Sequence, residues 1–349
     1  MYNYKDIKQV HLEPTQKCQA RCPMCDRNVN GGVDNKYLTN ADLSLMDIKM
    51  MMPVDFVRQL ENLYMCGNHG DPMMAPEALE ILQWLKEINP KIRLAMNTNG
   101  GARRPQWWAE LAQVIDHVTF SVDGLEDTNH LYRQGVSWER VEANMHAFCR
   151  AGGNAKWEFL VFKHNEHQLE EAENLSKLLG IKTFSVKKSG RYMSSATLTK
   201  KSSHQAHDRH NINTQLLEPP TMERFRNKAT KQFDQVTAKF GSMENYLDVA
   251  EIQPKCIKKK EIYISAEGYT FPCCWTAGQM NKWWQKPGEA QIWEHIDKQP
   301  INAMVTPIEE IVNTFFNSIE EAWEVGPNRL KVCALKCNRQ FDPFAAQWQ

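Results

Sequence analysis

The sequence lacks any apolar run long enough to cross a lipid bilayer, and residues 1–6 lack the apolar core of a signal peptide. It also lacks net charge, because 42 lysines and arginines balance 42 aspartates and glutamates. No global electric field therefore attracts the protein to a nucleic acid or to an anionic membrane. An internal repeat is absent as well. These absences predict a cytoplasmic protein that binds neither membranes nor long nucleic acids.

Disulfides are also unexpected, although the chain has ten cysteines, because a reducing cytoplasm keeps thiols free. Cysteines in such a compartment indicate metal binding, and most of these fall into two groups. The groups are Cys18, Cys22 and Cys25 near the start, and Cys256, Cys273, Cys274, Cys333 and Cys337 near the end. Cys66 and Cys149 stand apart, and we expect them to pack in apolar surroundings.

The 349 residues, of which 42% are hydrophobic and 24% charged, suffice for one large globular domain and a smaller one. In the first half, short β-type segments alternate with amphipathic helical segments. We expect strands at 10–12, 63–66, 93–97, 117–122, 157–162 and 183–187, and helices at 54–63, 76–88, 107–115, 138–150 and 166–179. This alternation predicts an α/β fold over residues 1–189, namely a partial (β/α)6 barrel of the TIM type.

The rest of the chain departs from this alternation. Residues 190–254 are polar, contain His204, His207 and His210, and have a helical pattern over 221–240, so we interpret them as a linker or an inserted helical region. The three histidines fit a polar loop better than a metal site. Residues 255–349 form a smaller module, in which 261–265 and 269–271 flank a turn and predict a β-hairpin. Ser318 and Glu321 have the spacing of a capping box, which predicts the start of a helix.

The N-terminal cysteines are separated by three and by two residues, so their thiolates can bind one metal cluster from a single loop. A 4Fe–4S cluster normally takes four cysteine thiolates, and three leave one iron open for chemistry. A zinc site and three unrelated buried cysteines are the alternatives. Zinc motifs usually consist of two paired halves, and no second half follows nearby. The loop follows the first predicted strand, which places it at the face where such barrels carry their active residues.

This CxxxCxxC spacing of Cys18, Cys22 and Cys25 resembles that of the radical SAM superfamily. The resemblance implies that the open iron binds the amino and carboxylate groups of S-adenosylmethionine. Gly70-Asp71-Pro72 resembles the family's Gly-Gly-Glu or Gly-Glu-Pro motif after the second strand, with aspartate in place of glutamate. Gly70 and Asp71 would then hold the ammonium group of the methionine moiety, since a carboxylate complements an ammonium and glycine permits close approach.

Further predicted strand ends carry motifs that resemble those of the same family. Asn97-Thr98-Asn99 resembles the segment near the ribose and carboxylate of S-adenosylmethionine, and Ser121 and Asp123 resemble the next strand-end motif. Arg133 stands where related sequences often have an arginine suited to a carboxylate. Met24 replaces the aromatic residue that often precedes the third cysteine, and its thioether could pack on adenine.

The C-terminal cysteines resemble those of the SPASM/twitch group. Cys256 is followed by Gly268 and, after four more residues, by Cys273, as in the signature C-x(9–15)-G-x4-C. Cys333 and Cys337 would complete the ligands of one auxiliary 4Fe–4S cluster without an open iron. A full SPASM domain usually has seven cysteines and two clusters, so five cysteines indicate a single twitch-like cluster. Cys274 could replace Cys273 as a ligand, and structural zinc is the alternative metal.

The resemblance implies that the first cluster cleaves S-adenosylmethionine reductively to a 5′-deoxyadenosyl radical, which takes a hydrogen atom from a bound substrate. The closed second cluster could accept an electron from the substrate radical. We therefore expect an oxidoreductase-type enzyme that oxidises or rearranges a small metabolite and receives electrons from flavodoxin or ferredoxin. A peptide-modifying maturase and a non-enzymatic iron–sulfur electron carrier are the other hypotheses. The first predicted strand begins by residue 10, which leaves no room for an N-terminal peptide-binding domain and favours a small molecule, or a peptide delivered by a separate partner. The sequence identifies no catalytic base.

Overall fold

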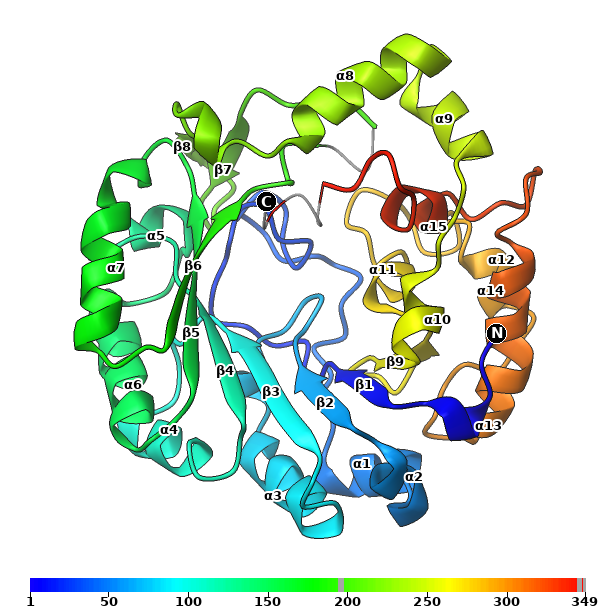
Figure 1. The fold of residues 1–349 in the computed structure, drawn as a ribbon, viewed down its shortest axis with the longest axis horizontal. Coiled ribbons are helices and arrows are strands. Elements are labelled where there is room, and N and C mark those ends of the chain that lie inside the picture. Colours follow the sequence, from blue (N-terminus) through cyan, green and yellow to red (C-terminus); the bar gives the residue numbers. More distant parts are fainter. Residues whose placement is uncertain (194–197, 344–346, 348–349) are drawn as a thin grey trace.

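The computed structural model describes residues 1–193, 198–343 and 347, and its centre is a curved sheet (Figure 1). The first six strands are parallel and follow one another in chain order. They are β1 (Gln9–Leu12), β2 (Asn62–Met65), β3 (Arg93–Thr98), β4 (His117–Ser121), β5 (Ala155–Val161) and β6 (Thr183–Lys188). The six predicted strands are therefore confirmed, with shifts only at their ends, and so is the α/β class.

Helices lie outside the curve of this sheet (Figure 1). They are α1 (Leu45–Met51), α2 (Val54–Gln59), α3 (Ala78–Ile88), α4 (Pro105–Leu111), α5 (Asn129–Tyr132), α6 (Trp138–Arg150) and α7 (Leu169–Leu178). Ser44 and Ser137 cap α1 and α6 by accepting backbone hydrogen bonds, and Pro105 starts α4. The helix predicted at 54–63 ends at Gln59, because residues 62–65 belong to β2. The helix predicted at 107–115 begins and ends earlier, and the one at 166–179 opens as the 3₁₀ turn Glu166–Gln168.

The hairpin predicted near the C-terminus is confirmed, but it belongs to the main sheet. Its strands are β9 (Glu261–Ile264) and β10 (Thr270–Phe271), which pair antiparallel. β9 also pairs in parallel with β1, with Val10 opposite Ile262, so the order of the eight strands in the described sheet is β10-β9-β1-β2-β3-β4-β5-β6. All four β9 residues are buried. The sheet thus crosses the boundary placed at residue 255.

The described part of the middle region contains more than helices. β7 (His204–His207) and β8 (Asn213–Leu217) form an antiparallel hairpin that the sequence pattern did not predict. The 3₁₀ turn Glu223–Phe225, α8 (Ala229–Phe240) and α9 (Met243–Val249) follow, so the helix predicted from residue 221 begins later. A separate apolar cluster joins α8 and α9 to the C-terminal part of the chain and includes Val236, Leu247, Leu335 and Phe341. This region is therefore packed against the end of the chain.

Apart from β9 and β10, the regular structure described in the C-terminal part consists of short helices. They are α10 (Lys255–Lys259), α11 (Cys274–Ala277), α12 (Trp293–Ile296), α13 (Ile308–Ile311), the π-helical turn Val312–Phe316, α14 (Asn317–Glu321) and α15 (Lys331–Lys336). The capping box predicted at Ser318 is wrong, because Ser318 lies inside the helical run from α13 to α14 and donates to the carbonyl of Phe315 at 2.8 Å. Among the described residues, no helix is both apolar enough and long enough to span a membrane.

Candidate functional site

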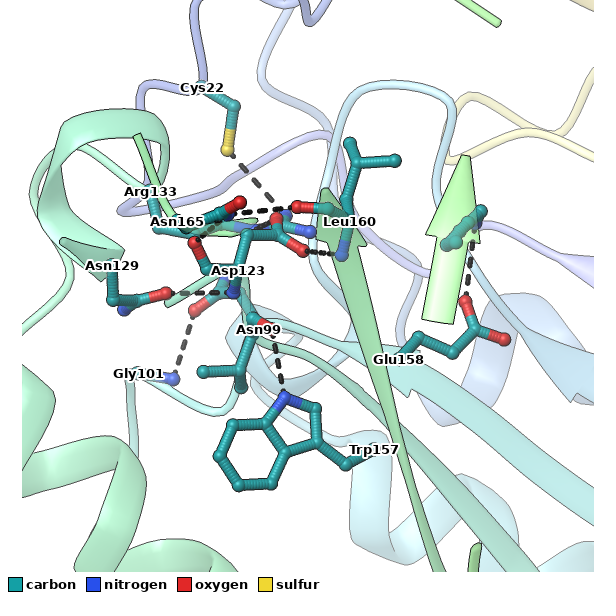
Figure 2. A network of polar contacts seen from close by, with 12 residues as sticks. Cys22, Asn99, Gly101, Asp123, Asn129, Arg133, Trp157, Glu158, Leu160 and Asn165 are labelled. Carbon is teal, nitrogen blue, oxygen red and sulfur yellow. Dashed lines mark hydrogen bonds and ion pairs between the residues drawn. The ribbon is translucent and has the colours of Figure 1, made fainter. Parts of the chain in front are cut away.

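The carboxyl ends of β1 to β4 bring most of the predicted site residues to one edge of the sheet. The cysteine loop follows β1, and the loops 66–72, 99–101 and 122–124 follow β2, β3 and β4. Because parallel strands end at the same edge, residues distant in the sequence meet here. Cys22 and Arg133, for example, are 111 positions apart and in contact (Figure 2).

The thiols of Cys18, Cys22 and Cys25 converge in a largely buried loop. All three are free, and Cys22 is 8% exposed. Burial raises the pKa of Cys18, and the negative charges of Asp71, Cys22 and Cys25 raise it further. The pKa of Cys25 is raised by burial and by Cys22. A bound metal cluster would stabilise the three neighbouring thiols as thiolates.

The Asp71 carboxylate is fully engaged inside the protein. Its Oδ1 accepts from Thr98 Oγ1 at 2.8 Å and from the backbone of Met73 at 3.3 Å. Its Oδ2 accepts from the backbone and the side-chain amide of Asn99, at 2.8 and 2.6 Å. A carboxylate offers about four lone-pair sites, so these donors use its acceptor capacity. Asp71 therefore fixes the end of β3, and the contact of this carboxylate with an ammonium group stays a prediction.

Asp123 and Arg133 form a second buried network (Figure 2). Asp123 Oδ2 accepts from Arg133 Nε at 2.7 Å, and its Oδ1 accepts from the backbone of Leu160 at 2.8 Å. Arg133 Nη1 in turn lies 3.6 Å from Cys22 Sγ. The guanidinium is thus held between a carboxylate that is 1% exposed and a predicted cluster ligand. This position next to the cysteine loop agrees with the prediction that Arg133 belongs to the site.

The remaining predicted contacts of S-adenosylmethionine lie around this edge with different exposures. Met24 is 9% exposed, and its carbonyl accepts a hydrogen bond from Arg191. Asn97 is exposed on β3, and Ser121 is half-buried at the end of β4. Among the described residues, neither side chain has a hydrogen bond to the three cysteines. Their roles as ligand contacts remain predictions.

Glu13 belongs to this site, although no motif pointed to it. Its Oε1 accepts from the backbone of His69 at 2.7 Å and of Gly70 at 3.0 Å, and Tyr263 donates to its Oε2. Glu13 is 1% exposed and directly follows β1. A charged residue immediately after a buried strand was the signal that could have identified it. It ties the loop after β2 to the start of the cysteine loop.

Gly70 is required by the close approach of these two loops. A Cβ at Gly70 would lie 1.8 Å from the carbonyl oxygen of Thr15. Gly70→Ala is therefore expected to push the loops apart and to lower the free energy of unfolding by about 1–3 kcal/mol. Urea unfolding of the metal-free protein measures this change. Gly326→Ala is the control, because a Cβ there meets no heavy atom within 4 Å. Equal stability of both variants and the parent would contradict the packing.

The C-terminal cysteines surround a second, smaller cavity of about 100 Å³. Its lining includes Cys256, Cys273, Cys274, Cys333 and Cys337. After burial, the negative charges of Cys273, Cys337 and Cys256 raise the pKa of Cys333, and those of Cys273 and Cys337 raise the pKa of Cys256. The pKa of Cys274 is instead raised, beyond burial, by Cys273, Glu261 and Cys66. All five thiols therefore line one cavity, and Cys274 differs from Cys256 and Cys333 in having Glu261 and Cys66 among its charged neighbours.

Two observations bear on what these cysteines hold. In the described part of the chain, no three His, Cys, Asp or Glu side chains are placed to bind one metal ion. Trp323 also lines the small cavity, and its buried indole Nε1 has no hydrogen bond of good geometry. Burial is the dominant effect on the pKa of Cys333 and raises it, whereas the Trp323 side chain lowers it. An indole N–H at this point suits a thiolate or sulfide acceptor.

A cavity of about 680 Å³ is lined by one cysteine of each group, Cys25 and Cys274. Met24, Cys25 and Asp26 line it on one side, and Cys274 and Trp275 line it on the other. Asn68, which also lines the cavity, donates a hydrogen bond to the carbonyl oxygen of Cys274 at 2.9 Å and so links the loop after β2 to α11. Small-molecule sites commonly have volumes of about 300–1,000 Å³. This cavity is therefore large enough for a small ligand next to both groups of thiols.

Charged side chains in this cavity were not predicted from the sequence. Asp26, next to Cys25, forms an ion pair with Lys282. Burial and, next, the positive charge of Lys282 lower the pKa of Lys336 to about 7. The Lys336 amine lies 4.3 Å from the centroid of the Trp275 ring. An amine with this pKa can hold or release a proton near neutral pH.

Comparison with known proteins supports the reading of this edge. Residues 12–176 match the family model described as the Radical SAM superfamily. The cofactor-modifying protein for tungsten-containing aldehyde ferredoxin oxidoreductase of Pyrococcus furiosus is 24% identical over 184 residues, which are 50% of this chain and 49% of that protein. The FeMo cofactor biosynthesis protein NifB of Chlorobaculum tepidum is 25% identical over 143 residues, 40% of this chain and 33% of that protein. The matches thus span half or less of these curated relatives.

Solved structures with the same fold cover almost the whole chain. SuiB of Streptococcus suis, bound to its precursor peptide SuiA, has a TM-score of 0.56 and 12% identity, over 99% of this chain and 77% of that one. Native anSMEcpe with bound AdoMet has a TM-score of 0.53 and 13% identity, over 97% of this chain and 93% of that one. The family implies a 4Fe–4S cluster and S-adenosylmethionine. Residues 12–176 therefore match the radical SAM superfamily, and these folds agree with that match.

Proposed function

We propose that the protein is a radical SAM enzyme that acts on a small molecule between two 4Fe–4S sites. Cys18, Cys22 and Cys25 would hold the first cluster, and Cys256, Cys273, Cys333 and Cys337 the second. The observation that carries the proposal is the cavity of about 680 Å³, whose lining includes Cys25 of the first group and Cys274, which is next to the proposed ligand Cys273. A substrate in this cavity would lie within reach of the first site for hydrogen abstraction and of the second for electron transfer.

The thiols fit such clusters better than single zinc ions. Neither group is arranged around one ion among the residues described. Donors that suit sulfur acceptors surround both, namely Asn99 and Arg133 at the first site and the Trp323 indole at the second. With its cluster and S-adenosylmethionine bound, the first site would supply one-electron reductive cleavage and a radical that abstracts hydrogen. The protein's part is to bind, orient and exclude water.

The residues at the strand ends divide into two proposed roles. Contact with S-adenosylmethionine is assigned to Met24, Gly70, Asn97, Asn99, Ser121 and Arg133. Asp71, Thr98 and Asp123, whose polar groups are used within the protein, would position these contacts. Lys336 would exchange a proton with a substrate in the cavity, since its pKa is lowered to about 7. A net oxidation would follow if the second cluster accepted the electron left on the substrate.

A peptide substrate is the second candidate, and two neighbouring structures favour it. SuiB was solved with the precursor peptide SuiA, and anSMEcpe with the Cp18Cys peptide. The volume of the cavity favours a small molecule or a single side chain of a peptide. Flavodoxin or ferredoxin is proposed as the electron donor in either case.

Anaerobic reconstitution tests the proposal. The protein is loaded with iron and sulfide, reduced with dithionite and incubated with S-adenosylmethionine. We expect 5′-deoxyadenosine to form, and deuterium from a labelled substrate to appear in it. If the loaded protein forms no 5′-deoxyadenosine with any candidate substrate, only the electron-carrier hypothesis is left. Deuterium transfer from a peptide but from no small molecule would favour the second candidate.

A further inference from the structure

Two hydrogen-bond donors are directed at the thiols of the first cysteine group. Asn99 Nδ2 lies 3.7 Å from Cys18 Sγ, and Arg133 Nη1 lies 3.6 Å from Cys22 Sγ. Both distances are within the range of hydrogen bonds to sulfur, which is larger than oxygen. The donors come from different elements, since Asn99 follows strand β3 and Arg133 ends helix α5. The same arrangement therefore occurs twice, with different residue types.

Each donor is held by its own buried carboxylate. Asp71 Oδ2 accepts from Asn99 Nδ2 at 2.6 Å, and the second N–H of this amide is left for Cys18. Asp123 Oδ2 accepts from Arg133 Nε at 2.7 Å, as Figure 2 shows. The two carboxylates are 6% and 1% exposed. Because the carboxylates are themselves fixed by backbone donors, Asn99 and Arg133 have little freedom to turn away from the sulfurs.

We propose that Asn99 and Arg133 donate hydrogen bonds to the Cys18 and Cys22 thiolates and thereby raise the reduction potential of the first cluster, with Asp71 and Asp123 as positioning residues. This inference rests on the proposed function, since it needs a cluster at these cysteines. Reduction adds negative charge to the cluster and its sulfurs. A donor aimed at a ligand sulfur stabilises the reduced state more than the oxidised state. The positive charge of Arg133 acts in the same direction.

This role is compatible with a ligand contact of Arg133. A guanidinium has five N–H groups, and Asp123 and Cys22 use two of them. The other three are available for a carboxylate of S-adenosylmethionine. The two roles are separated by measuring the potential of the cluster without S-adenosylmethionine, where only the bond to sulfur can act.

The test compares midpoint potentials of the reconstituted protein in titrations followed by electron paramagnetic resonance. Arg133→Met and Asn99→Leu remove the donors and keep much of the side-chain volume. We expect the ratio of reduced to oxidised first cluster at a fixed potential to fall roughly tenfold in each variant, a shift of about 59 mV for one electron. Lys163→Met is the control, because it removes a positive charge paired with Glu218 at the surface and should leave the potential unchanged.

Further variants keep the outcome decisive. If Arg133→Met binds no cluster, two milder variants replace it. Arg133→Lys retains the charge and a donor, and Asp123→Asn weakens the contact that holds the guanidinium. We expect each to shift the midpoint potential of the first cluster to lower values, by less than the loss of the donor would. Parental potentials in the Asn99 and Arg133 variants would overturn the inference. A parent protein that assembles a cluster at the C-terminal cysteines but none at Cys18, Cys22 and Cys25 would instead overturn the proposed function.

Discussion

Replacing Cys22 with alanine is expected to abolish reductive cleavage of S-adenosylmethionine, with a loss of several orders of magnitude. The two remaining thiolates cannot hold a 4Fe–4S cluster in which only one iron is open, because such a cluster needs three. Cys22 is also the thiol that Arg133 contacts, so its removal leaves a buried guanidinium without this acceptor. The measurement is the rate of 5′-deoxyadenosine formation after anaerobic reconstitution.

Cys149→Ala is the matched control for this variant. Cys149 lies in α6 and is a free, half-buried thiol outside both cysteine groups. We expect this variant to cleave S-adenosylmethionine at the parental rate and to keep the parental iron content. If Cys22→Ala retained cleavage while folded, the three cysteines would not be the ligands of the reactive cluster.

Cys333→Ser is expected to lower the iron content from about eight to about four atoms per chain. Cys333 is 9% exposed and has three other thiols as electrostatic neighbours, so its loss opens the proposed second cluster. Cleavage of S-adenosylmethionine without substrate should persist, since the first site is untouched. Turnover of a substrate that must be oxidised should be lost. Iron and sulfide analysis, together with product analysis, separates these effects.

A pair of neighbouring cysteines sharpens this second test. The negative charge of Cys273 raises the pKa of Cys256 and of Cys333. The pKa of Cys274 is raised by burial and Cys273, and also by Glu261 and Cys66, which are not among the largest effects on the other two. We therefore expect Cys273→Ser to lose iron and Cys274→Ser to retain it. The reverse result would make Cys274 the fourth ligand. Stoichiometric zinc in the parent protein, with only one iron–sulfur cluster, would contradict a second cluster altogether.

Much of the barrel was predictable from local pattern because its parallel strands are short, apolar and separated by helices. β3, for instance, was expected at 93–97 and runs from Arg93 to Thr98. Errors came where one pattern fits two structures. Val57, Leu60 and Leu63 have helical spacing, yet the helix ends at Gln59 and Leu63 lies in β2. The pairing of β2 with β1 and β3 decided that Leu63 belongs to a strand and not to the helix.

Non-local features of the fold could not be predicted. β7 and β8 carry mostly polar residues, so their pairing has no apolar signature in the sequence. The pairing of β9 with β1 joins residues about 250 positions apart, and no local signal encodes it. Ser318 shows the same limit, since a serine that fits a helix start can also be satisfied inside a helix by a carbonyl.

The candidate site was predictable where spacing carries the chemistry. The first cysteine group, Gly70, Asn99, Asp123 and Arg133 were all identified from short motifs, and the structure brings them to one edge of the sheet. What a side chain does there depends on its partners, which the sequence does not reveal. Asp71 is an internal acceptor for β3. Glu13 and Lys336 gain their properties from burial and from neighbours far along the chain.

The parallel pairing of β9 with β1 limits how this protein can be divided or recombined. A chain ended after the sixth strand would leave one side of β1 without partners for its backbone groups, and unpaired sheet edges promote association with other chains. The strand that protects this edge is supplied by the segment that also carries the second set of cysteines. Exchange of that segment between related genes would therefore have to preserve β9 along with the cysteines. Selection on folding alone would keep the two halves together, even in a lineage that no longer used the second set of cysteines.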